Sequence, residues 1–154
     1  MLVIEPASDL DEVRAIVREY AESLGVDLEF QGFAHEMETL AEYYFVILVA
    51  RWNGELAGCV ALRHLDDGIC EMKRLYVRQA YRGHDIGRSL AEKTFAIARE
   101  RGYRAMRLDT LPSMQSAMRL YEQLGFVDIA PYRFNPIEGT RFLERKLESG
   151  NSFK

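Results

Sequence analysis

Residues 72–91 read M-K-R-L-Y-V-R-Q-A-Y-R-G-H-D-I-G-R-S-L-A. The pattern predicts a strand that ends at Val77, a basic loop, and a helix that begins near Ile86. Gly83 and Gly87 allow the loop to turn tightly and its backbone to approach a ligand closely. The first amides of the helix lack intrahelical acceptors and carry the positive end of the helix dipole. This combination predicts a phosphate-binding turn.

The spacing of the glycines distinguishes three phosphate-binding motifs. A Walker A loop requires G-x-x-x-x-G-K-[ST], but here three residues separate the glycines and no lysine follows, so that motif is excluded. A dinucleotide fingerprint requires G-x-G-x-x-G, and counted from Gly83 its second and third glycine positions hold Asp85 and Arg88. Asp109 stands near the position of a ribose-binding acid, so the dinucleotide motif stays as a minor alternative.

The loop resembles the pyrophosphate-binding motif of the GNAT superfamily of N-acetyltransferases, Q/R-x-x-G-x-G/A, commonly written R-G-x-G-x-G. Arg82, Gly83, Ile86 and Gly87 match this motif, whereas Asp85 stands where the family usually has glycine. A second motif follows in the expected order. Residues 117–126, A-M-R-L-Y-E-Q-L-G-F, are similar to the family pattern A-x-x-L-Y-x-x-x-G-F.

The length of 154 residues and the apolar content of 48% suit one domain with a substantial core. We expect this domain over residues 1–148, and a frayed tail over residues 149–154, which have little to bury. The net charge of −4 argues against a nucleic-acid partner. The start of the chain has neither a basic segment nor an apolar run of membrane-spanning length, so we expect a cytoplasmic protein without a membrane partner.

The cysteines and histidines indicate no metal site. Cys59 and Cys70 lie in apolar runs without C-x-x-C spacing and are typical of small buried side chains. His35, His64 and His84 are isolated from one another and from carboxylate clusters, so we expect no metal. A homodimer is left open.

The hydrophobic periods predict elements in the order β, α, α, β, β, β, α, β, α, β, β. Strands are expected at residues 2–5, 45–51, 55–65, 69–77, 104–109, 126–129 and 140–147, and helices at 10–24, around 37–41, at 86–101 and at 113–124. Residues 27–33 are expected to be irregular, and Ser113 is expected to cap the last helix. The order is that of the GNAT fold. It implies an α/β (α+β) domain with a mixed, mostly antiparallel sheet of six to seven strands and helices on both faces.

The resemblance implies two catalytic residues. An alkyl amine has a pKa near 10.4, so its attack on a thioester at neutral pH requires a base or a lowered pKa. Glu71 stands where many family members carry the general base, although a strand glutamate paired with Lys73 or another cation is the simpler interpretation. Tyr121 stands where the family carries the acid that protonates the leaving thiolate, although an amphipathic core tyrosine is the simpler interpretation.

The resemblance also implies that acetyl-CoA is the co-substrate. The backbone from Leu75 to Val77 would pair with the pantetheine arm like an added strand, and an amide there would stabilise the oxyanion. The complete set of expected cofactor-binding residues is Leu75, Tyr76, Val77, Arg82, Gly83, His84, Asp85, Ile86, Gly87 and Arg88.

The acceptor site of the family is built from the segment between the first two strands and the loop between the last two. These correspond here to residues 19–42 and 131–139. The expected substrate-binding residues are Phe30, Gln31, Tyr132, Arg133 and Asn135. We therefore expect an acetyl-CoA-dependent N-acetyltransferase acting on a small-molecule amine. A peptide or protein N-acetyltransferase and a non-catalytic CoA-binding sensor domain are the alternatives.

Overall fold

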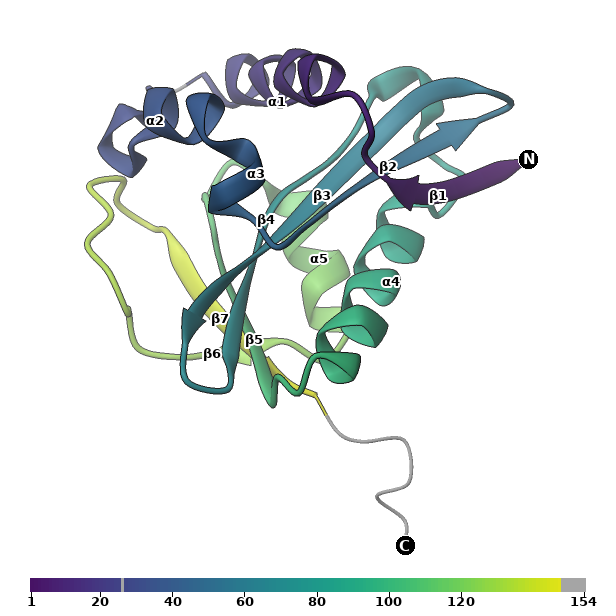
Figure 1. Ribbon diagram of the computed structural model, residues 1–154. Coiled ribbons are helices and arrows are strands. Elements are labelled where there is room, and N and C mark those ends of the chain that lie inside the picture. Colours follow the sequence, from purple (N-terminus) through teal and green to yellow (C-terminus); the bar gives the residue numbers. More distant parts are fainter. Residues whose placement is uncertain (26, 148–154) are drawn as a thin grey trace, which may run out of the picture. The chain divides into compact units, whose positions relative to one another are not determined.

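The computed structural model describes residues 1–25 and 27–147, without the side chains of Phe30 and Gln31 (Figure 1). The expected frayed tail, residues 149–154, lies outside the described residues. The helices are α1 (Leu10–Leu24), α2 (Phe33–Glu38), α3 (Leu40–Tyr43), α4 (Ile86–Glu100) and α5 (Gln115–Gln123), with short 3-10 helices at Leu28–Gln31 and Gln79–Tyr81. The strands are β1 (Leu2–Pro6), β2 (Val46–Trp52), β3 (Glu55–Asp66), β4 (Ile69–Val77), β5 (Ala105–Thr110), β6 (Val127–Asp128) and β7 (Arg141–Lys146).

The strands form one mixed sheet in the order β1-β2-β3-β4-β5-β7-β6. β1 with β2, β2 with β3, β5 with β7 and β6 with β7 pair antiparallel, while β4 and β5 pair parallel. The predicted fold class is confirmed. By their contacts the residues divide into two compact units, of which one comprises residues 1–63 and 72–94 and the other residues 64–71 and 95–154.

The core of the first unit lies beneath the three N-terminal helices (Figure 1). Asp9 caps α1 because its side chain accepts hydrogen bonds from the next amides, and Gly25 ends the helix with a left-handed φ of 69°. The apolar stripe of α1 meets α2, α3 and the sheet. The core residues are Val13, Ile16, Val17, Met37, Leu40, Tyr44, Val49, Leu56, Cys59 and Ala61.

Gly58 allows β3 and β4 to approach each other closely. A Cβ atom built on Gly58 would lie 2.7 Å from the carbonyl oxygen of Tyr76 and 3.3 Å from Leu90 of α4. The pairing of β2 with β3 also shifts register between Ala50 and Arg51, opposite this position. Gly58 of β3 therefore allows the close approach of β4, the strand that leads into the predicted phosphate-binding turn.

The second unit contains the parallel pairing of the start of β4 with β5. The register places Glu71 opposite Arg107, and Arg107 is in turn opposite Glu144 of β7. Alternate β5 residues, Met106 and Leu108, are buried in the core. Arg107 and Asp109 thus share the other face of the sheet with Glu71.

Three local predictions were wrong. Residues 27–33 are not irregular, because Asp27 accepts a hydrogen bond from the Glu29 amide at 2.9 Å and begins a 3-10 helix. The one helix expected around residues 37–41 is two short helices, α2 and α3, because Thr39 between them has a non-helical backbone. Ser113 does not cap α5, which begins at Gln115 and is preceded by Met114 without a side-chain cap. The other elements differ from the predicted bounds by one or two residues at most ends, which is the usual uncertainty of helix and strand termini.

Candidate active site

Arg74, within β4, has a left-handed backbone with a φ of 64°. This conformation is uncommon outside glycine and disturbs the simple alternation of side chains that is expected along a strand. Beyond Arg74, Leu75, Tyr76 and Val77 are half-buried. The Tyr76 hydroxyl donates to Glu19 at 2.8 Å.

The predicted phosphate-binding turn follows β4 and leads into α4, a helix of 15 residues. In the described part of the chain, the amides of residues 83–87 donate to no other group. Arg82 donates its Nε to the Val77 carbonyl at 2.9 Å, and the His84 ring stacks on Trp52 with 4.3 Å between centroids. Five consecutive amides at the positive end of a helix can bind an anion.

Asp85 adopts the backbone conformation that the motif requires from glycine. Its φ is 59°, and its side chain is exposed. Aspartate tolerates this left-handed region better than most residues do. Asp85 thus combines a left-handed backbone in the turn with a side chain that is exposed.

Glu71 lies at the centre of a polar group in the second unit. Its side chain is 0% exposed, the Tyr132 hydroxyl donates to its Oε2 at 2.7 Å, and Arg133 donates Nη2 to the same oxygen. Arg133 thus pairs with Glu71, as the simpler interpretation of Lys73 or another cation allowed. The structure thus joins the predicted base to two predicted acceptor residues, 61 and 62 positions away.

Asp109 is a second carboxylate of this group, and sequence reasoning assigned it no role in acetyl transfer. Arg133 also approaches it, with 3.7 Å between Nη1 and Oδ2, and Asn135 donates Nδ2 to it at 3.4 Å. Its place at the end of β5, on the face of Glu71, was a signal that could have identified it. The predicted residues Tyr132, Arg133 and Asn135 therefore all belong to one group with Glu71.

The charges in this group shift two pKa values. Burial and the neighbouring Glu71 carboxylate raise the pKa of the Tyr132 hydroxyl far above 10.0, so it stays a hydrogen-bond donor. Burial alone would lower the pKa of Arg133, but the charge and hydrogen bond of Glu71 outweigh it, and the pKa is raised. Tyr132 and Arg133 therefore both stay protonated, and both donate hydrogen bonds to Glu71, over the pH range in which enzymes usually work.

Tyr121, the predicted acid, lies on α5 and is 5% exposed. Its ring packs edge-on against Phe126, with centroids 5.7 Å apart. This contact follows from the second sequence motif, which contains both residues. This packing holds the ring in place. The role of Tyr121 as the acid stays a prediction.

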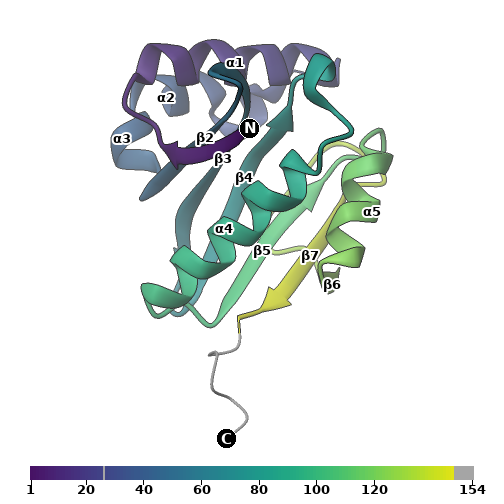
Figure 2. The ribbon, with the colours of Figure 1, turned by 90° about the vertical axis from the view of Figure 1, so that its right-hand side faces the viewer.

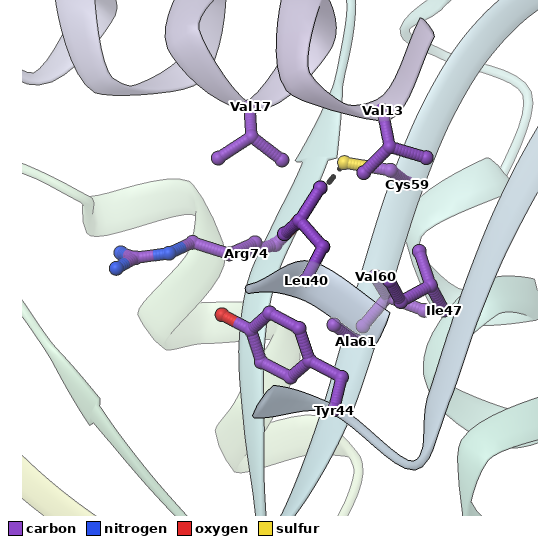
Figure 3. Close-up of a pocket in the computed structure, with 9 residues that line it drawn as sticks. All are labelled: Val13, Val17, Leu40, Tyr44, Ile47, Cys59, Val60, Ala61 and Arg74. Atoms are coloured by element: carbon purple, nitrogen blue, oxygen red, sulfur yellow. Dashed lines mark hydrogen bonds between the residues drawn. The ribbon is translucent and has the colours of Figure 1, made fainter. Parts of the chain in front are cut away.

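A buried ionic group in the first unit was missed by sequence reasoning. Arg74 donates Nε and Nη2 to Glu36 at 3.0 and 2.6 Å, and the Tyr44 hydroxyl donates to the same carboxylate. Figure 3 shows Arg74 and Tyr44 at a small cavity of about 10 Å³ beneath α1, where Cys59 also contacts the Arg74 carbonyl at 3.3 Å. An arginine within the apolar strand β4 was the signal for a buried acidic partner.

An open pocket lies on the predicted acceptor segment of the first unit. Its volume is about 490 Å³, within the range of small-molecule pockets. The Arg14 Nε donates to the Met37 carbonyl at 2.7 Å and so ties α1 to α2 at this pocket. The lining residues are Arg14, Arg18, Glu29, Phe33, Ala34, Met37 and Glu38. The predicted acceptor residues Phe30 and Gln31 lie in the adjoining 3-10 helix, but their side chains are not described.

Neither a metal cluster nor a membrane span is found. Over the described residues, no three His, Cys, Asp or Glu side chains are grouped to hold a metal ion. Among the same residues, every helix is too short or too polar to cross a bilayer.

The comparisons with known proteins agree with this fold. Residues 10–126 match the model of the acetyltransferase (GNAT) family. An uncharacterized N-acetyltransferase of Schizosaccharomyces pombe, C1271.07c, is 37% identical over 90% of this chain and 89% of its own. A GNAT acetyltransferase structure from Staphylococcus aureus Mu50 superposes with a TM-score of 0.79, at 21% identity over 96% of this chain and all of that one. The Salmonella typhimurium protein yncA, solved with its cofactor acetyl-CoA, has a TM-score of 0.68 at 23% identity over 96% and 94% of the two chains.

The family model and the relatives define the class of this protein as an acyl-group-transferring enzyme, with an α/β fold. The chain belongs to the acetyltransferase (GNAT) family. It is an N-acetyltransferase, as its relatives are.

Proposed function

We propose that this enzyme transfers the acetyl group of acetyl-CoA to the primary amine of a small molecule, by direct attack of the amine on the thioester. The observation that carries the proposal is the contact of Glu71 with Tyr132 and Arg133. This contact links Glu71, the expected general base for the amine, to the loop that is expected to bind the acceptor. Such convergence of polar groups is typical of a substrate site.

Acetyl-CoA is proposed as the co-substrate because of the turn before α4. Its five unpaired amides and the helix dipole suit a pyrophosphate, and Arg82 and Arg88 add positive charge nearby. The half-buried backbone of residues 75–77 would hold the pantetheine arm. The acetyl-CoA bound in the Salmonella neighbour supports the same choice. No step of the proposed reaction requires a metal.

In the proposed reaction the amine nitrogen forms a bond to the acetyl carbon, and the carbon–sulfur bond breaks. Glu71 accepts the proton that the amine loses, directly or through water. Tyr121 gives its hydroxyl proton to the departing thiolate. An amide of residues 75–77 would stabilise the oxyanion that forms between these two steps.

Isothermal titration with acetyl-CoA, followed by a thiol-release assay over a panel of amines, tests the proposal. We expect saturable binding and release of CoA thiol with one or more small amines. Release only with peptide substrates would favour a peptide or protein N-acetyltransferase. Binding without release across a broad panel would favour a CoA-binding sensor, and failure to bind acetyl-CoA would contradict the cofactor assignment.

A further inference from the structure

Charged side chains of the second unit gather on one face of the sheet. Three carboxylates and two guanidinium groups face one another from β4, β5, β7 and the loop after β6, with Tyr132 and Asn135 beside them. The charged residues are Glu71, Arg107, Asp109, Arg133 and Glu144. The three carboxylates of this set are not equally well paired.

Asp109 has the longest contacts of the three carboxylates. Arg107 contacts Glu144 with 2.7 Å between Nε and Oε1, and Arg133 makes its close contact with Glu71. Asp109 is left with contacts of 3.7 Å to Arg133 and 3.4 Å to Asn135, both longer than a normal hydrogen bond.

Asp109 is also the more exposed carboxylate of the central pair. Its side chain is 13% exposed, whereas that of Glu71 is 0% exposed. A carboxylate that is largely removed from water and lacks a close counterion is unfavourable unless a cation joins it. The ammonium group of an incoming amine would supply that cation on binding, and it would then release one proton to water, so that the neutral amine attacks the thioester.

We propose that Asp109 is the specificity-determining residue that binds the acceptor as an ammonium ion, so that the enzyme selects aliphatic amines over amines that are neutral at working pH. This inference rests on the proposed function and names its substrate class. An alkyl amine has a pKa near 10.4 and is charged at neutral pH. An aryl amine or aryl hydrazine is neutral there, and it brings no charge to Asp109.

The test compares benzylamine with phenylhydrazine, two acceptors of similar size, in wild type and Asp109→Asn. For benzylamine we expect the KM to rise at least tenfold, which corresponds to about 1.4 kcal/mol, because a charge-assisted hydrogen bond is lost. For phenylhydrazine we expect a change below about twofold, since no such bond is formed. A purely structural role for Asp109 would impair both acceptors alike.

Two further variants serve as controls. Asp109→Glu keeps the charge and should restore the preference for benzylamine. Asp128→Asn removes an exposed carboxylate of the same unit that is paired with Arg141 outside this set, and it should leave both KM values within about twofold of wild type. Thermal unfolding of each variant checks that the fold is retained.

Binding of benzylammonium to each protein in the presence of CoA gives a readout that needs no turnover. Ligand-observed NMR should detect binding to wild type and Asp128→Asn, and its loss in Asp109→Asn. Equal binding to all three, or an equal change of both KM values in Asp109→Asn, would overturn the inference. Wild-type protein that binds benzylammonium but releases no thiol with any amine would contradict the proposed function and leave the role of Asp109 supported.

Discussion

Arg74 and Glu36 form a two-point ion pair inside the first unit, with 3.0 Å between Nε and Oε2 and 2.6 Å between Nη2 and Oε1. The side chains are 5% and 0% exposed, and the Tyr44 hydroxyl donates to the same carboxylate. The pair joins α2 to the strand whose backbone is left-handed at Arg74. Breaking such a pair leaves a buried charge without a partner, which is more damaging than never having the pair.

The first prediction concerns Glu36→Gln and the pH dependence of stability. Burial alone would raise the pKa of Glu36, but the hydrogen bonds and charge of Arg74 outweigh it, so the pKa lies below its ordinary value of 4.5. The unfolded chain then binds a proton more readily than the folded chain does. The stability from this group is fully present above about pH 4.5, and it is lost as the pH falls through the folded pKa.

At neutral pH we therefore expect Glu36→Gln to lower the free energy of unfolding by about 3 kcal/mol. The difference from wild type should narrow in acid, because the wild-type carboxyl is then protonated as well. Urea unfolding at neutral and acidic pH measures both values. Glu38→Gln, an exposed position of the same helix, is the matched control. A loss for Glu36→Gln that stays constant with pH would assign the effect to packing.

The second prediction concerns Asp85→Gly, at the residue that departs from the family motif. Glycine adopts a φ of 59° without strain and removes a negative charge near the expected pyrophosphate. We expect acetyl-CoA to bind up to about tenfold more tightly, with most of the gain at low salt, where surface charges are least screened. Titration at low and high salt measures this. Weaker binding by the variant would mean that the Asp85 side chain contributes directly to the site.

Much of the fold was predictable because its signals are local. The glycine turn, the cap at Asp9 and the stop at Gly25 depend on residues that are close in sequence. Asp85 stands where the family motif usually has glycine, a residue that favours a positive φ, and its own φ is 59°.

The pairings of charged residues were not predictable in the same way. Glu71 pairs with Arg133, which lies 62 positions away in the sequence, and Glu36 pairs with Arg74, which lies 38 positions away. Nothing in an amphipathic helix shows that one of its glutamates will be buried, since such residues are mostly exposed. Asp109 was missed because its significance depends on the charges around it, which only the folded sheet brings together.

The third prediction concerns Tyr121→Phe. If the hydroxyl protonates the leaving thiolate, kcat should fall by about 10²-fold or more, since general acid catalysis contributes that much. The ring contact with Phe126 is kept, so stability and the affinity for acetyl-CoA should change little. Steady-state kinetics and titration separate the two effects. Unchanged turnover would leave Tyr121 with a packing role.

The last prediction concerns Glu71→Gln, which removes the carboxylate charge and keeps the shape of the side chain. If Glu71 accepts the proton of the amine, the profile of kcat/KM against pH should lose its acidic limb. Alternatively, that limb should shift to higher pH, where the amine is already deprotonated in solution. The change also leaves Arg133 with only its 3.7 Å contact to Asp109 as an ion pair in the described group. Some loss of stability is therefore expected in addition to the kinetic effect.

Arg133→Gln and the double variant separate these two effects of Glu71→Gln. The ion pair couples the two residues, so the destabilisation of the double variant should be smaller than the sum of the single ones. The altered pH profile should follow Glu71 alone and should not be restored in the double variant. A wild-type profile in Glu71→Gln would remove Glu71 from proton transfer, and it would leave the carboxylate with the task of holding Arg133 and Tyr132 in place.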